Sequence, residues 1–443
     1  MPESEAKEAK AGEMSRGFRP KLGASSGHNR VLLQEQLNLD HPLVKLSQAI
    51  EWQEFEAEFG NPMSREGGRP ALRTRLMVGL HYLKALYNES DESVVAKWVE
   101  NPYWQYFCGA ETFEHEFPCH PTSLVKWRQR VGVEGVEKLL QQVLRSATVQ
   151  QALQPCEIER VTVDTTVQEK AIAFPTDARL YEKARRALVR VARQHQVKLR
   201  QSYVRLGKQA LFWQSRYASA RQAKRAKAQT RKLRTYLGRV VRDIERKMSD
   251  IPQAVQSLLE IAKRIYQQQP KDTGKLYSVH APEVECIATG KVHKRYEFGC
   301  KVVLATTAAS NWIVGIDAVH GNPYDGATLK GALAQAEKLT AVKPKQAFVD
   351  KGFRGTTHHP LEVEVFVAGT RKLTGALKRC LKRRSAIEPV IGHSKQDHAL
   401  GRNYLQGQIG DRINAYLAGC GFNLRKLFRF FLTHPLIHSQ AIA

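Results

Sequence analysis

Short apolar runs rich in β-branched residues recur along the chain and constrain its fold more than any other feature. Five such runs fall at 159–168, 296–307, 311–319, 347–350 and 364–368. Segments with helical spacing separate several of them. Strands interleaved with helices are typical of a mixed sheet with helices packed on it. The sequence therefore predicts an α/β fold for this part of the chain.

Residues 41–147 show helical spacing instead. One amphipathic stripe begins behind Pro70 and contains Leu76, Leu80 and Leu83. Short helices joined by tight turns are compatible with a helix-turn-helix DNA-binding module, and a helical packing domain that touches no DNA is the alternative. The last of these helices carries three basic candidates for DNA contact: Lys126, Arg128 and Arg130.

A strongly basic segment lies between the first two expected strands, at 176–269, and is called the arm below. From Arg179 to Lys247 it carries 22 Lys and Arg residues against three acids, within a chain of net charge +26 and pI near 9.8. We expect a long antiparallel helical hairpin whose basic outer face contacts phosphates; a merely solvated arm is the alternative. Three candidates for phosphate contact in this segment are Lys224, Arg225 and Lys227.

Other features exclude several classes of protein. No run of about 18 apolar residues is present, so no membrane span is expected. The seven cysteines form no CxxC pair, which favours reduced thiols in a cytoplasmic, nucleoid-associated protein. The group Cys108, His115, Cys119 and His120 matches no zinc spacing. No Walker-type phosphate loop occurs, which argues against an ATP-driven motor.

Three acids lie where a metal site is expected. Asp164 ends the first strand, Asp350 ends the fourth, and Glu388 lies on a late helix. Strand ends converge at one edge of such a sheet, and carboxylates gathered there repel unless cations lie between them. Oxygen ligands select Mg²⁺ or Mn²⁺, and two such ions suit phosphodiester chemistry. Asp317 and Asp397 are alternative ligands.

The run 384–395 adds two cations to this set. On one continuous helix, Arg384, Glu388 and Lys395 would lie within roughly 40° of one another. Pro389 disfavours helical geometry at the residue before it. A capping box at 385–388 is therefore the alternative, and it would leave Arg384 outside the helix.

Several segments together resemble bacterial insertion-sequence transposases with an RNase H-like DDE core, in particular the family named after insertion sequence five. The similar segments are 68–127, 163–172, 298–302, 322–329, 349–355 and 384–405. The resemblance covers most of residues 40–430. Related transposases have a tyrosine three residues before the arginine, where this chain has Leu381.

The resemblance implies a role for individual residues. It implies that Asp164, Asp350 and Glu388 are catalytic and bind Mg²⁺ or Mn²⁺, with two ions expected. Further phosphate contacts are expected from five basic residues: Arg384, Lys395, Lys351, Arg354 and Arg402. For Arg402, Asn403 and Tyr404, core packing is an equal alternative.

The resulting expectation is an α/β protein with an RNase H-like mixed sheet, flanking helices, an N-terminal all-helical domain and a basic helical insertion. The expected divisions are a flexible tail (1–30), a DNA-binding or dimerisation domain (31–155), a catalytic domain (156–175 and 270–435) and the arm (176–269). Such a transposase would bind double-stranded DNA at its element ends, cleave it, and transfer the 3′-hydroxyl into target DNA, acting as a dimer or larger assembly. A repurposed DNA-binding protein and a metal-dependent nuclease are the alternatives.

Overall fold

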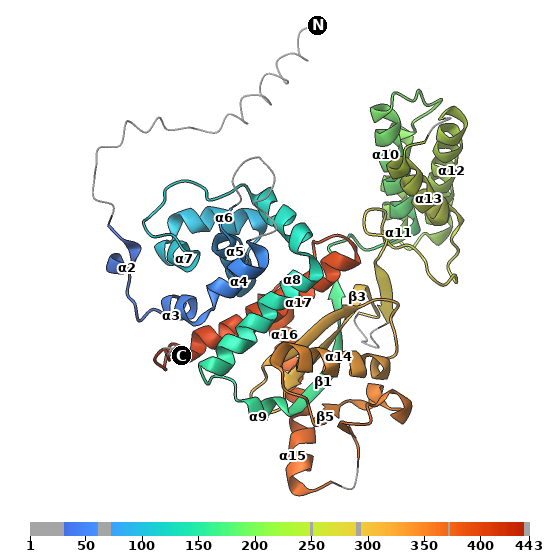
Figure 1. The fold of residues 1–443 in the computed structure, drawn as a ribbon. Coiled ribbons are helices and arrows are strands. Elements are labelled where there is room, and N and C mark those ends of the chain that lie inside the picture. Colours follow the sequence, from blue (N-terminus) through green and yellow to red (C-terminus); the bar gives the residue numbers. More distant parts are fainter. Residues whose placement is uncertain (1–30, 61–71, 249–250, 289–293, 371–372, 438–443) are drawn as a thin grey trace, which may run out of the picture.

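The computed structural model describes residues 31–60, 72–248, 251–288, 294–370 and 373–437. The expected flexible tail and Pro70 lie outside the described residues. The structure is a mixed α/β fold, as the sequence predicted, with helices on a central sheet and a group of helices that projects from it (Figure 1).

The central sheet has six strands in the described residues: β1 (Arg160–Glu169), β2 (Glu285–Ala288), β3 (Tyr296–Thr307), β4 (Ile313–Val319), β5 (Gln346–Val349) and β6 (Glu364–Val367). The order is β2-β3-β1-β5-β6, and β4 also pairs with β3. β1, β3 and β4 are antiparallel neighbours, whereas β1, β5 and β6 run parallel. Five strands match the expected runs. The four-residue β2 is too short to stand out as a pattern.

Two long helices pack on the sheet. α14 (Asp325–Thr340) packs on β3 and β4, and α17 (Gly407–Phe430) packs on β4, α5 and α8. α17 lies against α5 so closely that a Cβ at Gly421 would come within 2.3 Å of the Ala85 carbonyl oxygen. A glycine is therefore required where these helices meet.

The helices of residues 31–158 lie beside the sheet and share its hydrophobic core. They are α2 (Leu33–Gln36), α3 (Pro42–Ala49), α4 (Trp52–Phe59), α5 (Thr74–Tyr87), α6 (Asp91–Glu100), α7 (Pro102–Phe107), α8 (Pro121–Val149) and α9 (Pro155–Ile158). α8 spans 29 residues, but the backbone of Gly132 is not helical (φ 66°, ψ −163°) and kinks the helix there. The part before Gly132 corresponds to the last of the short helices that we expected.

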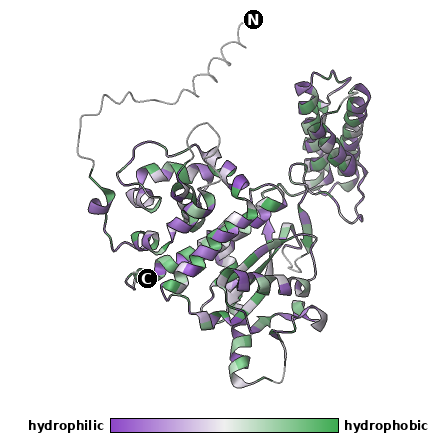
Figure 2. Cartoon of the chain, in the orientation of Figure 1, coloured by the Kyte–Doolittle hydropathy of each residue, from purple (hydrophilic) through white to green (hydrophobic). Residues whose placement is uncertain are grey.

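The arm contains four helices, so the prediction of a two-helix hairpin was wrong. They are α10 (Asp177–Gln194), α11 (Val204–Ser219), α12 (Ala223–Lys247) and α13 (Gln253–Gln267). They bury a core of their own, separate from that of the sheet, which includes Leu188, Leu237 and Leu259. Figure 2 shows hydrophilic and hydrophobic residues alternating around these helices. Four amphipathic helices can enclose apolar stripes that two helices would leave exposed.

The chain continues from β6 through α15 (Gly375–Arg383) and a short 3₁₀ turn, η4 (Arg384–Ala386), into α16 (Ile387–Asp397). A second 3₁₀ turn, η2 (Lys351–Phe353), follows β5, and a third, η3 (Thr356–His358), follows η2. Within the described residues, no helix is both long and apolar enough to cross a membrane.

Candidate functional site: a carboxylate pair at the sheet edge

Asp164 and Asp350 come together where two parallel strands run side by side. Val163 of β1 pairs with Val349 of β5, so the residues that follow them, Asp164 and Asp350, are neighbours. Asp350 follows the end of β5, but Asp164 lies inside β1, because β1 continues to pair with β3 as far as Glu169. The expectation that Asp164 ends the first strand was therefore wrong. The two side chains are partly buried. Asp350 is close enough to Asp164 to raise the pKa of its carboxyl group. These two residues, called the acid pair below, therefore adjoin as the sequence predicted.

The surroundings of Asp164 favour its protonated form. Burial, and then the charges of Asp350 and Asp325, raise the pKa of Asp164 to about 6. The Thr165 amide donates to Asp164 Oδ1 at 2.8 Å, and Arg384 Nη1 lies 3.4 Å from Oδ2. These two contacts oppose the shift without cancelling it. The pKa of Asp164 is therefore raised mainly because its carboxylate is withdrawn from water.

The loop after β5 is built around the Asp350 carboxylate. The Gly352 amide donates to Asp350 Oδ1 at 2.7 Å and closes the turn η2. A Cβ at position 352 would lie 2.9 Å from both Asp350 Oδ1 and Asp325 Oδ2. Because both oxygens lie 2.9 Å from the same point, Asp350 Oδ1 and Asp325 Oδ2 are at most twice that distance apart. Glycine at this position leaves room for the two carboxylates to approach.

Asp325 is a third acid at this edge. It is the first residue of α14, directly after the N-cap residue Tyr324. Its Oδ1 accepts from Thr165 Oγ1 at 3.0 Å and from Lys301 Nζ at 2.8 Å. The resemblance over 322–329 was the one signal that could have drawn attention to it.

Arg384 and Glu388 lie at the junction before α16. Arg384 belongs to the 3₁₀ turn η4, and α16 begins at Ile387 after the N-cap Ala386, which makes no side-chain cap. Neither the continuous α-helix nor the capping box is therefore correct. Glu388 is exposed, one turn after the residue that contacts Asp164. The described contacts join Asp164, Asp350 and Arg384 but do not include the Glu388 carboxylate.

The alternative ligands that the sequence suggested lie elsewhere. Asp317 binds Arg412 of α17, with Nε 2.9 Å from Oδ1. Asp397 pairs with His393 at 2.9 Å on the exposed side of α16. Both carboxylates are thus engaged by neighbouring side chains.

The basic candidates divide into exposed and buried residues. Lys395 is half-buried. Eight are exposed: Lys351, Arg354, Arg402, Lys126, Arg130, Lys224, Arg225 and Lys227. Arg128 is only 3% exposed and binds Asp91, with Nη1 2.9 Å from Oδ1. Asn403 is fully buried and donates to Asp411, whereas Tyr404 is exposed beneath the Arg402 guanidinium. The guanidinium of Arg128 is therefore not available to DNA in this structure.

The donor atoms of the acid pair fit a hard divalent cation. They are carboxylate oxygens, the ligands that Mg²⁺ and Mn²⁺ prefer. Burial, with a further contribution from the charges of Asp350 and Asp325, raises the pKa of Asp164 and so disfavours its ionised form. A divalent cation bound to Asp164 and Asp350 would stabilise the ionised form.

Comparisons with known proteins place the chain in a family. Residues 31–130 match a family described as "Transposase domain (DUF772)". The chain is also similar to a Rhizobium meliloti protein named "Uncharacterized protein ORF8 in nfe locus". The two are 51% identical over 201 residues, which is 45% of this chain and 97% of that protein. No solved structure matches. The chain belongs to a transposase family.

Proposed function

We propose that the protein is a DDE transposase of the type named after insertion sequence five. It binds the ends of its own element, cleaves the DNA strand there and joins the 3′-hydroxyl to target DNA. The observation that carries this proposal is the acid pair: Asp164 within β1 and Asp350 directly after the parallel strand β5 lie side by side, with Arg384 next to Asp164. The mixed sheet, antiparallel on one side of β1 and parallel on the other, supports an RNase H-like core.

Asp164 and Asp350 would hold the metal in this proposal, with Glu388 as the third carboxylate. Bound Mg²⁺ or Mn²⁺, in two ions, would activate the attacking oxygen and stabilise the leaving oxygen. Glu388 is exposed and lies four residues after Arg384, which contacts Asp164. The proposal requires the Glu388 carboxylate to reach the acid pair when the metal is bound. The Thr165 and Gly352 amides hold the two aspartates in place.

Positive charge around the site would orient the DNA backbone. Arg384 is partly exposed beside Asp164, while Lys351 and Arg354 are exposed in the loop that Asp350 begins. The Tyr324 hydroxyl donates to the Arg354 carbonyl oxygen and ties that loop to the start of α14. Phosphate contacts by these residues would position the strand for in-line attack.

Two larger surfaces would hold the rest of the DNA. On the arm, Glu182 is buried against Arg185, and Asp243 pairs with Arg246 and Lys247. Glu182 and Asp243 are thus paired with neighbouring basic residues of the arm. Lys224, Arg225 and Lys227 are exposed on α12. On the N-terminal helices, Lys126 and Arg130 remain candidates, and Arg128 does not. Two ends must be brought together for joining, so a dimer or larger assembly is part of the proposal.

A plasmid excision and strand-transfer assay tests the proposal. The plasmid carries the gene's own flanking DNA, and the reaction contains Mg²⁺. Asp350→Ala is expected to reduce excision at least about 100-fold, because it removes one of the two carboxylates of the acid pair. The matched control is Asp397→Ala, which removes an exposed acid from α16 and should leave excision unchanged.

The same assay separates the alternatives. Cleavage without joining by the wild-type protein would favour a nuclease. Binding of the flanking DNA with equal, background-level excision in wild type and Asp350→Ala would favour a repurposed DNA-binding protein. Mn²⁺ binding followed by electron paramagnetic resonance gives an independent readout, since Asp350→Ala should weaken it and Asp397→Ala should not.

A further inference from the structure

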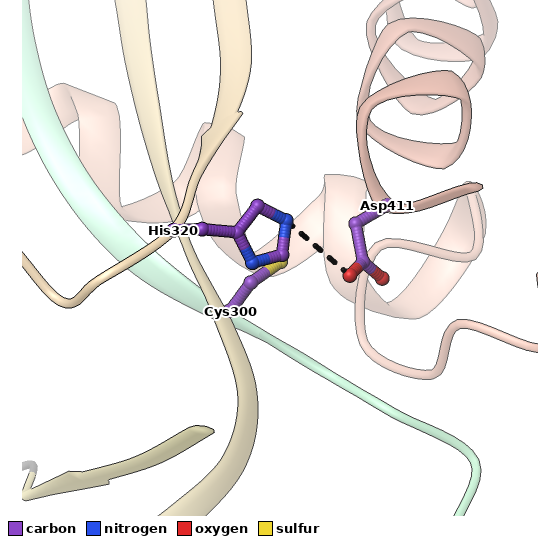
Figure 3. A group of neighbouring side chains, drawn as sticks. All are labelled: Cys300, His320 and Asp411. Carbon is purple, nitrogen blue, oxygen red and sulfur yellow. Dashed lines mark ion pairs between the residues drawn. The ribbon is translucent and has the colours of Figure 1, made fainter. Parts of the chain in front are cut away.

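A second group of metal-ligating side chains lies on the face of the sheet that α17 covers. It consists of Cys300 of β3, His320 just after β4 and Asp411 of α17, and is called the Cys300 cluster below (Figure 3). One ligand atom from each residue lies within 4.8 Å of the others. Lys301 pairs with Val319, so the neighbouring residues Cys300 and His320 lie opposite each other on one face.

The Cys300 cluster is distinct from the acid pair. Asp164 pairs with Leu304, which lies four residues along β3 from Cys300. At about 3.3 Å per residue the two positions are about 13 Å apart. A single metal ion therefore cannot bind to both sites.

The imidazole of His320 makes no hydrogen bond although both of its nitrogens are buried. Nε2 lies 3.5 Å from Asp411 Oδ2, and Nδ1 lies 3.4 Å from Glu285 Oε1. These separations are longer than a good hydrogen bond between such groups. Two ligands that each lie about 2.0–2.1 Å from a tetrahedral zinc ion are about 3.4 Å apart. The Nε2–Oδ2 spacing therefore fits two ligands of one ion.

The charges around the cluster favour a cation. Three carboxylates gather here, those of Glu283, Glu285 and Asp411. Among the described ion pairs, Lys170 pairs with Glu283 and Asp411, while Glu285 lies beside the His320 ring. The side chains of Lys170 and Asp411 are 5% and 4% exposed, so water screens them poorly. The surplus of negative charge is thus held in a buried place, where it is costly unless a positive ion compensates it.

We propose that Cys300, His320 and Asp411 bind one zinc ion. A thiolate and an imidazole select zinc over Mg²⁺, and the carboxylate completes a set of three protein ligands with a fourth position for water. The Cys300 thiol gives up its proton to solvent as the metal–sulfur bond forms. Glu285 lies on the far side of the ring, where a carboxylate that accepts from Nδ1 orients a metal-bound histidine.

The ion would stabilise the place where the chain re-enters the sheet after the arm. Its ligands come from β3, from the end of β4 and from α17, and Glu285 is the first residue of β2. A single ion would thus join the last helix to three strands. This role is structural and does not depend on the proposed transposase chemistry.

Cobalt substitution tests the proposal on the full-length protein. The protein is stripped with a chelator and titrated with Co²⁺, whose bond to a thiolate gives a charge-transfer band in the near ultraviolet. We expect this band to saturate at one equivalent and to disappear on addition of one equivalent of Zn²⁺. Asp350→Asn should keep the band, because the acid pair supplies no sulfur.

Three further variants assign the ligands. Cys300→Ser should abolish the band, whereas Cys420→Ser, which changes a buried thiol of α17 outside the cluster, should keep it. Glu285→Gln should keep the band but weaken Co²⁺ affinity about 10- to 100-fold. Absence of the band in the folded wild-type protein would overturn the proposal, and would indicate a protonated His320 between two carboxylates. A band that survives Cys300→Ser would overturn it equally.

Discussion

Asp164 keeps its proton at a pH at which an exposed aspartate has lost it. Its pKa is about 6 in the folded protein, against about 3.9 in an unfolded chain. Between these values the folded state binds more protons than the unfolded state. The free energy of unfolding therefore falls as the pH rises from about 4 to about 6. In the folded, metal-free protein, the ionised form of Asp164 is therefore disfavoured relative to the protonated form. This is expected of a metal ligand whose cation is absent.

Asp164→Asn should remove this dependence. In metal-free buffer above about pH 7, the variant should gain about 2 to 3 kcal/mol relative to wild type, compared with the same difference near pH 4. Urea unfolding at a series of pH values measures it. Asp40→Asn is the control, because the Asp40 side chain is 90% exposed. A difference between variant and wild type that does not change with pH would contradict this account of the shift.

Arg128 illustrates a residue whose type suggests one role and whose burial gives another. It and Lys84 hold the pKa of Asp91 below its usual range, although burial of Asp91 opposes the shift. Arg128→Met should lower the free energy of unfolding by about 3–5 kcal/mol, because it leaves Asp91 partly buried without its main partner.

The neighbouring Arg130→Met provides the contrast. Arg130 is exposed, so its loss should change stability by less than about 0.5 kcal/mol. If the N-terminal helices contact DNA, Arg130→Met should weaken DNA binding measured by gel shift. A stability loss of equal size in both variants would show that burial does not separate them.

Sequence patterns located the acid pair but not its neighbours. Asp164 and Asp350 each follow an apolar run, and the parallel pairing of β1 with β5 places them side by side. The pattern did not show that β1 continues past Asp164 along β3. Asp325 reaches the site through Thr165 and Lys301, which depends on how β1, β3 and α14 are packed. The Cys300 cluster depends on the register of β3 against β4 and on the position of α17. Neither the position of Asp325 nor the Cys300 cluster produces a residue spacing that can be recognised in the sequence.

Among the elements, the arm carries a prediction about salt. Replacing Lys224, Arg225 and Lys227 with glutamine should reduce the slope of log affinity against log salt by about 0.9 for each phosphate contact that is lost. The physical reason is that fewer counterions are released when fewer phosphates are neutralised. Gel shifts over a salt series measure the slope.

A matched triple variant supplies the control. Lys138, Arg145 and Lys343 are basic residues outside the arm that pair with Glu58, Glu54 and Glu362. Glutamine at these three positions removes the same charge from places where a glutamate already compensates it. Equal slopes for the two triple variants would mean that the arm does not meet phosphates.

The arm also shows why helix number was harder to predict than helix position. The apolar stripes around Leu188 and Leu237 were visible in the sequence, and both are buried. What the pattern could not show is that the stripes need partners from α11 and α13 to enclose a core. The break between α10 and α11 is marked by left-handed backbone at Gln196 and Tyr203, residues that do not signal a turn by type.

At the scale of the whole molecule, the two separate hydrophobic cores predict two unfolding steps. Leu237→Ala empties a buried position in the core of the arm, and Leu140→Ala does so in the core shared by the N-terminal helices and the sheet. Each should lower the stability of its own core by about 2–5 kcal/mol. Hydrogen exchange followed by mass spectrometry should show faster exchange in the mutated unit only.

Leu140→Ala and Leu237→Ala serve as controls for each other. If either substitution accelerated exchange throughout the chain, the molecule would unfold as a single unit despite its two cores.

The position of α17 has a consequence for synthesis on the ribosome. This helix is the last of the described elements to be translated, yet α5, α8 and β4 all pack on it. Until it emerges, a nascent chain exposes apolar faces that were made hundreds of residues earlier. A frameshift or stop codon before Gly407 therefore yields a product that cannot close its main core, even though the acid pair, Glu388 and the arm have all been translated.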